Sequence, residues 1–139
     1  MIYLVQEPTN LLNEAIKFAK ENNYKIYSLN KLKTKEKYHD VSDASLEDFL
    51  YLIKNAKCVF TTSFHGLSLS INMNTNLYYE LSHKPINNNA RLIDLCSSLG
   101  LSNREVGETI NNEDIDWNDV NHKLDLLRNE SIKYLKDNL

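Results

Sequence analysis

The sequence predicts an open parallel β-sheet covered by helices, a Rossmann-like α/β fold. Short apolar runs of strand type alternate along the chain with segments whose apolar residues have helical spacing. The chain has 139 residues, which is enough to bury a core and is suited to one domain. Crossovers between parallel strands are right-handed, so this alternation gives a doubly wound sheet. We therefore expect a single domain over residues 1–139.

The first third of the chain contains two predicted strands and one helix. Ile2–Val5 is a short apolar run and is expected to form the first buried strand. Thr9 or Asn10 can cap the helix that follows it. Lys25–Leu29 is the second predicted strand. Residues 30–40 are polar, rich in lysine and without periodicity, so we expect them to form an exposed loop.

The middle of the chain repeats the alternation. Ser45 is expected to begin a second helix, with Asp48 three residues later in a weak capping-box arrangement. Lys57–Thr61 is the third predicted strand, and the apolar segment Leu67–Met73 after it is expected to be helical. Asn76–Leu81 is the fourth predicted strand.

The last third is expected to be mostly helical. Asn88 or Asn89 can cap a helix that Gly100 is well placed to end. Residues 102–115 show no regular pattern. A final helix is predicted from about 118 to 138, because its apolar residues fall near heptad spacing. We expect it to pack back across the domain or onto a partner.

Composition excludes several classes of protein. The formal net charge is −3, whereas a general nucleic-acid-binding protein would have a basic excess. Cys58 and Cys96 lie far apart in apolar surroundings, which favours buried, reduced thiols over a disulfide scaffold. No apolar run reaches the ~18 residues that span a membrane, and no secretory signal opens the chain. We therefore expect a cytoplasmic protein without a nucleic-acid partner.

Common catalytic and metal-binding motifs are also missing. The four histidines are spread over different predicted elements, and neither Cys-x-x-Cys nor His-x-x-x-His occurs, so no metal site is expected. The chain has only three glycines and contains neither a P-loop nor a Gly-x-Gly-x-x-Gly motif, which disfavours a dinucleotide cofactor. The stretch that begins at Gly66 lacks the second glycine of a nucleophile elbow.

The turn after the third predicted strand is the strongest candidate site. Thr62, Ser63, His65 and Gly66 lie within five residues, directly before a predicted helix. A helix start offers unpaired N–H groups and a positive dipole, which suit a phosphate or carboxylate. His65 could contact such a ligand, or it could be a partly buried residue that only caps the helix. Ser63 alone is more often only an N-cap, and Gly66 alone carries little weight.

The segment after the fourth predicted strand could add positive charge to the same site. It contains Lys84, and Arg91 follows one turn into the next helix. The carboxyl ends of parallel strands share one edge of the sheet, so the two side chains could lie beside His65. An arginine would offer a planar fork to an anion. Each residue taken alone is more often a solvated surface side chain.

One stretch of sequence resembles a known family. Asp48–Gly66 contains a helix ending in Ala56, a short strand and the tetrapeptide Ser63-Phe64-His65-Gly66. This stretch is similar to the second half of the polysaccharide pyruvyl transferase family. Asn89–Ile93 and Leu99–Arg104 resemble the later helix of that family and its Leu-Gly-Leu ending. The resemblance is clearest over residues 41–104.

The resemblance implies a fold similar to the C-terminal half of a two-domain GT-B enzyme. It also implies transfer of a pyruvyl group from phosphoenolpyruvate to a glycan or lipid-linked saccharide, as a ketal, in surface or extracellular polysaccharide synthesis. His65 matches the family's histidine, which is linked to donor binding and proton transfer, and Ser63 stands where some members have arginine. Lys84 lies near a lysine of some members, and we expect Phe64, Gly66 and Arg91 to help bind the donor.

The same resemblance also leads to expectations about the domains, cofactors and location of the whole protein. Family members carry a further domain before this one, so we expect an N-terminal domain or partner chain to complete the site. No cofactor besides the phosphoenolpyruvate donor is expected. The protein would be cytoplasmic or peripheral to the inner face of the membrane. Two alternatives remain open: a non-catalytic Rossmann-like binding or interaction module, and the sugar-nucleotide half of a glycosyltransferase.

Overall fold

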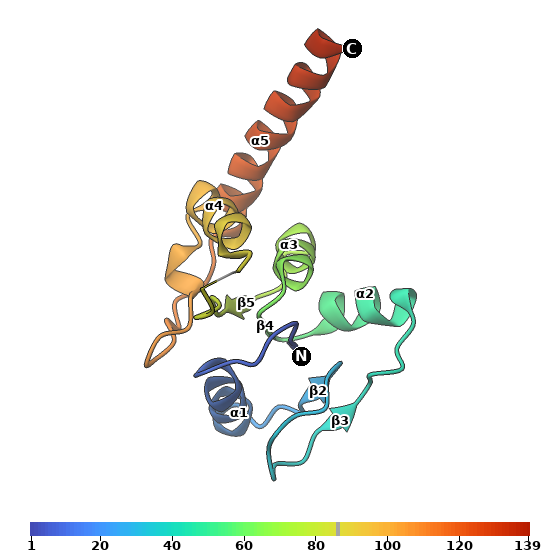
Figure 1. The fold of residues 1–139 in the computed structure, drawn as a ribbon, viewed down its shortest axis with the longest axis vertical. Coiled ribbons are helices and arrows are strands. Elements are labelled where there is room, and N and C mark those ends of the chain that lie inside the picture. The colour runs from blue at the N-terminus through green and yellow to red at the C-terminus, as the bar shows by residue number, and fades with distance from the viewer. Residues whose placement is uncertain (86) are drawn as a thin grey trace.

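The computed structural model describes residues 1–85 and 87–139. In sequence order, their elements are β1 (Ile2–Tyr3), α1 (Leu11–Glu21), β2 (Tyr27–Ser28), β3 (His39–Asp40), α2 (Leu46–Asn55), β4 (Val59–Thr61), α3 (Phe64–Asn72), β5 (Leu77–Tyr79), α4 (Asn89–Leu99), the 3-10 turn Ser102–Arg104 and α5 (Trp117–Asn138). All strand pairs are parallel, in the order β3-β2-β1-β4-β5. The predicted Rossmann-like α/β fold is thus confirmed (Figure 1).

Helix starts and ends follow the local sequence signals closely. The hydroxyl of Ser45 accepts the N–H of Asp48, and the Asp48 carboxylate accepts the N–H of Ser45, which completes the expected capping box of α2. The Ser45 hydroxyl also donates to the Asp48 carboxylate at 2.8 Å, and this bond, with the one from the Ser45 N–H, holds the pKa of Asp48 below its usual value. Gly100 ends α4 in the left-handed conformation with φ of 72°. Asn10 and Asn88 precede α1 and α4 but make no side-chain cap.

The edge strand β3 is the main difference from the sequence prediction. Residues 30–40 were expected to be an exposed loop, yet His39 and Asp40 pair in parallel with Tyr27 and Ser28 of β2. The His39 ring stacks on Tyr27, with the ring centroids 4.6 Å apart. A two-residue polar strand has no hydrophobic alternation, so its ladder leaves no periodic signal in the sequence.

Two further elements differ in extent from the prediction. The segment 102–115, expected to be irregular, begins with the 3-10 turn Ser102–Arg104, and Glu105 makes a parallel bridge with Tyr79. Helix α3 begins at Phe64 instead of Leu67, so it follows β4 after a link of two residues. The site tetrapeptide therefore forms the cap and the first turn of this helix.

The sheet separates two apolar cores. On one face, Leu11 and Ala15 of α1 pack on Phe60 and Tyr78, together with Val106. On the other face, the buried residues come from the remaining α-helices, from Leu101 after α4 and from the alternate positions of β4 and β5. They are Ile53, Val59, Leu67, Ile71, Leu77, Tyr79, Leu92, Cys96, Leu99, Leu101 and Val120. Successive strand residues point to opposite faces, so β4 and β5 contribute to both cores.

A buried arginine links the C-terminal segment to the sheet. The side chain of Arg104 is 1% exposed, and its guanidinium lies 4.9 Å from the centroid of the Tyr78 ring. It donates to the Tyr78 hydroxyl, the Asn76 side chain and the Asn111 carbonyl, at 3.1, 3.0 and 2.7 Å. These three acceptors satisfy the guanidinium in a buried position.

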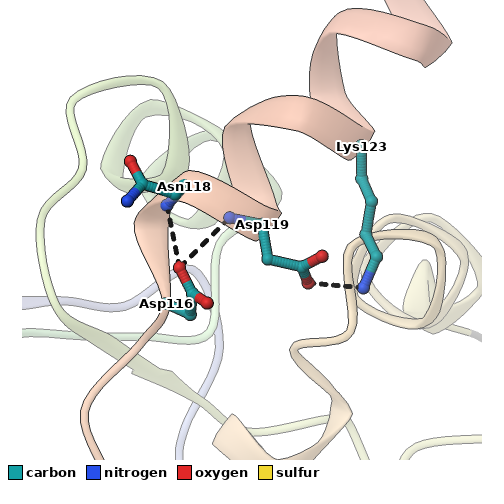
Figure 2. A network of polar contacts seen from close by, with 4 residues as sticks. All are labelled: Asp116, Asn118, Asp119 and Lys123. Atoms are coloured by element: carbon teal, nitrogen blue, oxygen red, sulfur yellow. Dashed lines mark hydrogen bonds and ion pairs between the residues drawn. The ribbon is translucent and has the colours of Figure 1, made fainter.

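Helix α5 begins at a well-defined cap and then extends away from the domain (Figure 1). The Asp116 carboxylate accepts the N–H groups of Asn118 and Asp119, and the Asp119 carboxylate is 2.6 Å from the Lys123 ammonium (Figure 2). Val120 is the buried residue of this helix, whereas every side chain from 128 to 139 is exposed. The first part of α5 therefore packs on the domain.

Within residues 1–85 and 87–139, no helix has both the length and the apolar character that crossing a bilayer needs.

Candidate functional site

The candidate site lies where the order of the sheet reverses. From β1 the chain builds outward through β2 and β3 on one side and through β4 and β5 on the other. Ligands of open parallel sheets bind at such a switch point, beyond the carboxyl ends of the strands. Here the loops that follow β1 and β4 meet, since the N–H of Thr62 donates to the carbonyl of Tyr3 at 3.2 Å.

Two threonines hold these loops together. The hydroxyl of Thr62 accepts the N–H of Val5 at 3.0 Å and that of Gln6 at 3.4 Å. The hydroxyl of Thr61 donates to the Tyr3 carbonyl at 2.7 Å and accepts the N–H of Ser63 at 3.0 Å. Both side chains are buried, so their hydrogen bonds fix the turn between β4 and α3.

Ser63 and Gly66 shape the start of α3. Ser63 is buried, with extended backbone angles, and its hydroxyl accepts the N–H of Gly66 at 3.4 Å, as an N-cap does. A β-carbon on Gly66 would stand 2.5 Å from the Thr61 hydroxyl oxygen and 3.0 Å from the Tyr3 ring. The missing side chain of Gly66 therefore lets α3 pack closely on the sheet.

His65 lies in the first turn of α3 with its side chain exposed. It is therefore neither a buried residue nor the cap of the helix, because Ser63 is the cap. Among the described residues, no partner accepts the backbone N–H groups of Phe64 and His65. An exposed imidazole thus stands beside two free amides at the positive end of a helix dipole.

Arg91 extends the site from α4. Its guanidinium lies 4.6 Å from the centroid of the Phe64 ring, which is a cation–π contact. The ring of Phe64 also meets that of His65 edge-on, with the centroids 6.2 Å apart. Phe64 thus places a cation and an imidazole at the same helix start. The structure therefore brings Ser63, Phe64, His65, Gly66 and Arg91 together.

Lys84 lies at the same edge of the sheet, where its charge acts on Glu7 in the loop after β1. The ammonium of Lys33 is 2.6 Å from the Glu7 carboxylate and lowers the pKa of Glu7, and the charge of Lys84 adds a smaller lowering. The side chain of Lys84 is exposed. Within the described part of the chain, no contact joins it to His65. Lys84 is therefore a neighbour of the candidate site and not a part of its central cluster.

Glu80 is the residue at this edge that sequence analysis missed. It follows β5 directly, is 4% exposed, and its carboxylate accepts the backbone N–H groups of Thr9, Asn10 and Leu11 at the start of α1. A carboxylate directly after a buried apolar strand was the available signal. The same edge is braced by Asn89, whose side-chain amide pairs with both backbone groups of Ser82 at 2.8 Å.

Cavities lie at both edges of the sheet. An open depression of about 450 Å³ at the carboxyl edge is lined by the loops after β1 and β2, including Gln6 and Lys31. A cleft of about 460 Å³ with a more apolar lining lies at the opposite, amino edge, between Phe18 and Tyr51. In parallel sheets the chemistry belongs to the carboxyl edge, so we place the site there and not in the apolar cleft. The described residues hold no cluster of three or more potential metal ligands.

Comparison with known proteins agrees with this geometry. Residues 2–79 match the family model of polysaccharide pyruvyl transferase, which is more than half of the chain and runs from β1 through β5. The matched segment includes Ser63–Gly66, whereas Glu80, Lys84 and Arg91 lie beyond it. No curated protein and no solved structure matches the chain. The chain belongs to the polysaccharide pyruvyl transferase family.

Proposed function

We propose that this chain supplies the donor-side half of an enzyme that transfers a pyruvyl group from phosphoenolpyruvate to a glycan. The observation that carries the proposal is the open start of α3, where the exposed His65 and Arg91 flank Phe64 beside two free amides. Family membership supports transferase chemistry in general. The geometry supports a small anion as the ligand of this chain.

Phosphoenolpyruvate suits this environment because it carries both a phosphate and a carboxylate. The free N–H groups of Phe64 and His65 can donate to one anionic group, and the α3 dipole favours negative charge there. The guanidinium of Arg91 can hold an anionic group as a fork. Lys84 adds positive charge at the same edge. The same donors would stabilise the phosphate as it departs.

The reaction removes one proton from each of two hydroxyls, and it delivers one proton to the terminal methylene of the donor and one to the departing phosphate oxygen. One glycan hydroxyl adds to the central carbon of the enol, and the terminal methylene takes up a proton and becomes methyl. A second hydroxyl of the same glycan then displaces the phosphate, which leaves as inorganic phosphate, and the ketal closes. His65 is exposed and lies at the start of α3, beside the free amides that would bind the anion. We therefore assign it the proton transfer to the methylene or to the leaving oxygen.

The acceptor would reach this site from outside the chain. The carboxyl edge of the sheet is open at the loops after β1 and β2, and an N-terminal domain or a partner chain would present a glycan or a lipid-linked saccharide there. Such an enzyme would act in surface polysaccharide synthesis, in the cytoplasm or at the inner face of the membrane.

The proposal is tested by titrating the chain with phosphoenolpyruvate in calorimetry, with a UDP-sugar as the competing ligand. Saturable binding of phosphoenolpyruvate is expected, and His65→Ala should weaken it about tenfold or more, because a hydrogen bond to a charged ligand is lost. His122→Ala is the matched control, since His122 is an exposed histidine on α5. This control should bind like the wild type.

Each of the two alternatives predicts a different result. A non-catalytic interaction module would bind neither ligand and would form a stable dimer in sedimentation. The sugar-nucleotide half of a glycosyltransferase would bind the UDP-sugar in preference to phosphoenolpyruvate. Either result, or unchanged phosphoenolpyruvate binding in His65→Ala, would contradict the proposed function.

A further inference from the structure

The two helix starts that meet at the switch point differ in what occupies them. At α1, the carboxylate of Glu80 accepts the N–H of Asn10 at 2.8 Å and that of Leu11 at 2.6 Å, and its other oxygen accepts the N–H of Thr9. At α3, the amides of Phe64 and His65 have no partner among the described residues. One anion position is therefore filled from within the chain, and the other is open.

The Glu80 carboxylate accepts hydrogen bonds from the amides at the start of α1, as a bound phosphate would. In Rossmann-like domains, the amides at the start of the first helix are the usual phosphate site. Glu80 comes from the far side of the switch point, at the end of β5, and is 4% exposed. None of the ion pairs between described residues involves it, so the three amides and the α1 dipole are what stabilise its buried charge.

We propose that Glu80 is a specificity-determining residue, an internal anion that closes the α1 start to phosphate groups. An anionic substrate is then directed to α3. A nucleoside diphosphate cannot bind the α1 amides, which are its binding site in a dinucleotide-binding domain. This inference deepens the proposed function and rests on it for the identity of the ligand at α3. The closure of α1 follows from the Glu80 contacts alone.

Like-charge repulsion and desolvation both support this role. A phosphate approaching α1 would have to expel a buried carboxylate that already holds three amides, or lie next to it. Two neighbouring anions in a water-poor site repel each other strongly. The same contacts tie the loop after β1 to the end of β5.

The test is residue-resolved. The full chain labelled with ¹⁵N is titrated with inorganic phosphate, and separately with uridine diphosphate, while the backbone amide signals are followed. In the wild type, phosphate should shift the signals of Phe64 and His65 and leave those of Thr9–Leu11 unchanged. In Glu80→Ala, the signals of Thr9–Leu11 should also shift saturably. The affinity for phosphate at these amides should be at least about tenfold above the wild-type value. Glu108→Ala, which alters an exposed loop glutamate, is the control and should behave like the wild type.

The outcomes separate this inference from the proposed function. Shifts at Thr9–Leu11 in the wild type, or none there in a folded Glu80→Ala, would overturn the role of Glu80. If Thr9–Leu11 respond in the variant while Phe64 and His65 respond in neither protein, Glu80 keeps its role and the donor site at α3 fails. Should Glu80→Ala not fold, Glu80→Gln decides the question, because it keeps the side-chain shape and removes the charge. Thr9–Leu11 of that variant must then respond to phosphate.

Discussion

Gly66 shows how one residue sets the position of the candidate site. Its α-hydrogen faces the sheet at a point where a methyl group would stand 2.5 Å from the Thr61 hydroxyl oxygen. We predict that Gly66→Ala pushes α3 away from β4 and lowers the free energy of unfolding by about 1–3 kcal/mol, as overpacking usually does. Urea unfolding followed by circular dichroism measures this change.

The exposed loop glycine offers the comparison. A β-carbon on Gly107 meets nothing within 4 Å, so Gly107→Ala should change stability by less than about 0.5 kcal/mol. Equal effects of the two substitutions would show that the contact of Gly66 with Thr61 is not what requires the glycine. The displaced helix in Gly66→Ala should also weaken anion binding at α3, because its free amides move with it.

At this scale, sequence analysis could find the residues that act through local structure. Ser63 and His65 stand out because a strand, a turn and a helix start lie within a few positions of one another. The position of Glu80 directly after an apolar strand is a signal in the sequence, but its role is not, because the amides that it binds lie 69 to 71 residues earlier in the chain. The sequence marks Arg104 only as part of the segment that resembles the pyruvyl transferase family. Its buried partners, Asn76 and Tyr78, become its neighbours only in the fold.

Among the elements, α5 divides into two parts with different roles. Its beginning is held by the Asp116 cap, by the buried Val120 and by a hydrogen bond of 2.6 Å from Arg128 to Asn72 of α3. Every side chain beyond that point is exposed. We predict that deleting residues 130–139 lowers the free energy of unfolding by less than about 1 kcal/mol, measured by urea unfolding.

Val120→Ala is the contrasting change in the same helix. It empties part of the core and should cost about 2 kcal/mol. Hydrogen exchange gives a second readout, since the amides of residues 130–138 should exchange far faster than those around Val120. A large loss of stability on deletion would mean that the exposed part of α5 is buried in solution, which sedimentation would then trace to a second copy of the chain.

The elements also show where sequence patterns end. The helices were predictable because their caps and apolar spacing are local, as with Ser45 and Asp48 in α2 and with Gly100 after α4. The strands are shorter than their apolar runs, with two or three residues each. Strand β3 was missed because a polar edge strand is made by its ladder with β2 and not by side-chain burial.

At the scale of the whole molecule, the order of the strands in the sheet brings loops that are distant in the sequence together into one site. Alternating strands and helices predicted a parallel sheet, but strands of two or three residues carry too little information to rank their neighbours. The order β3-β2-β1-β4-β5 places the reversal between β1 and β4. That reversal, and not any single motif, brings the loop after β1, the start of α3 and Glu80 to one edge.

The buried thiols predict how the whole fold responds to alkali. Burial raises the pKa of Cys58 and of Cys96 to about 12, and they lie in opposite cores. Unfolded thiols ionise near pH 8.5–9, so the folded state holds more protons above that pH and stability falls as pH rises toward 12, by about 1.4 kcal/mol per pH unit for each thiol. Urea midpoints should therefore decline steeply between about pH 9 and pH 10. The doubly substituted protein with Cys58→Ala and Cys96→Ala should decline much less over this range. Burial also raises the pKa values of Tyr78 and Tyr79, but from an ordinary value of 10.0, so their contribution comes at higher pH. An identical decline would mean that the thiols do not govern it.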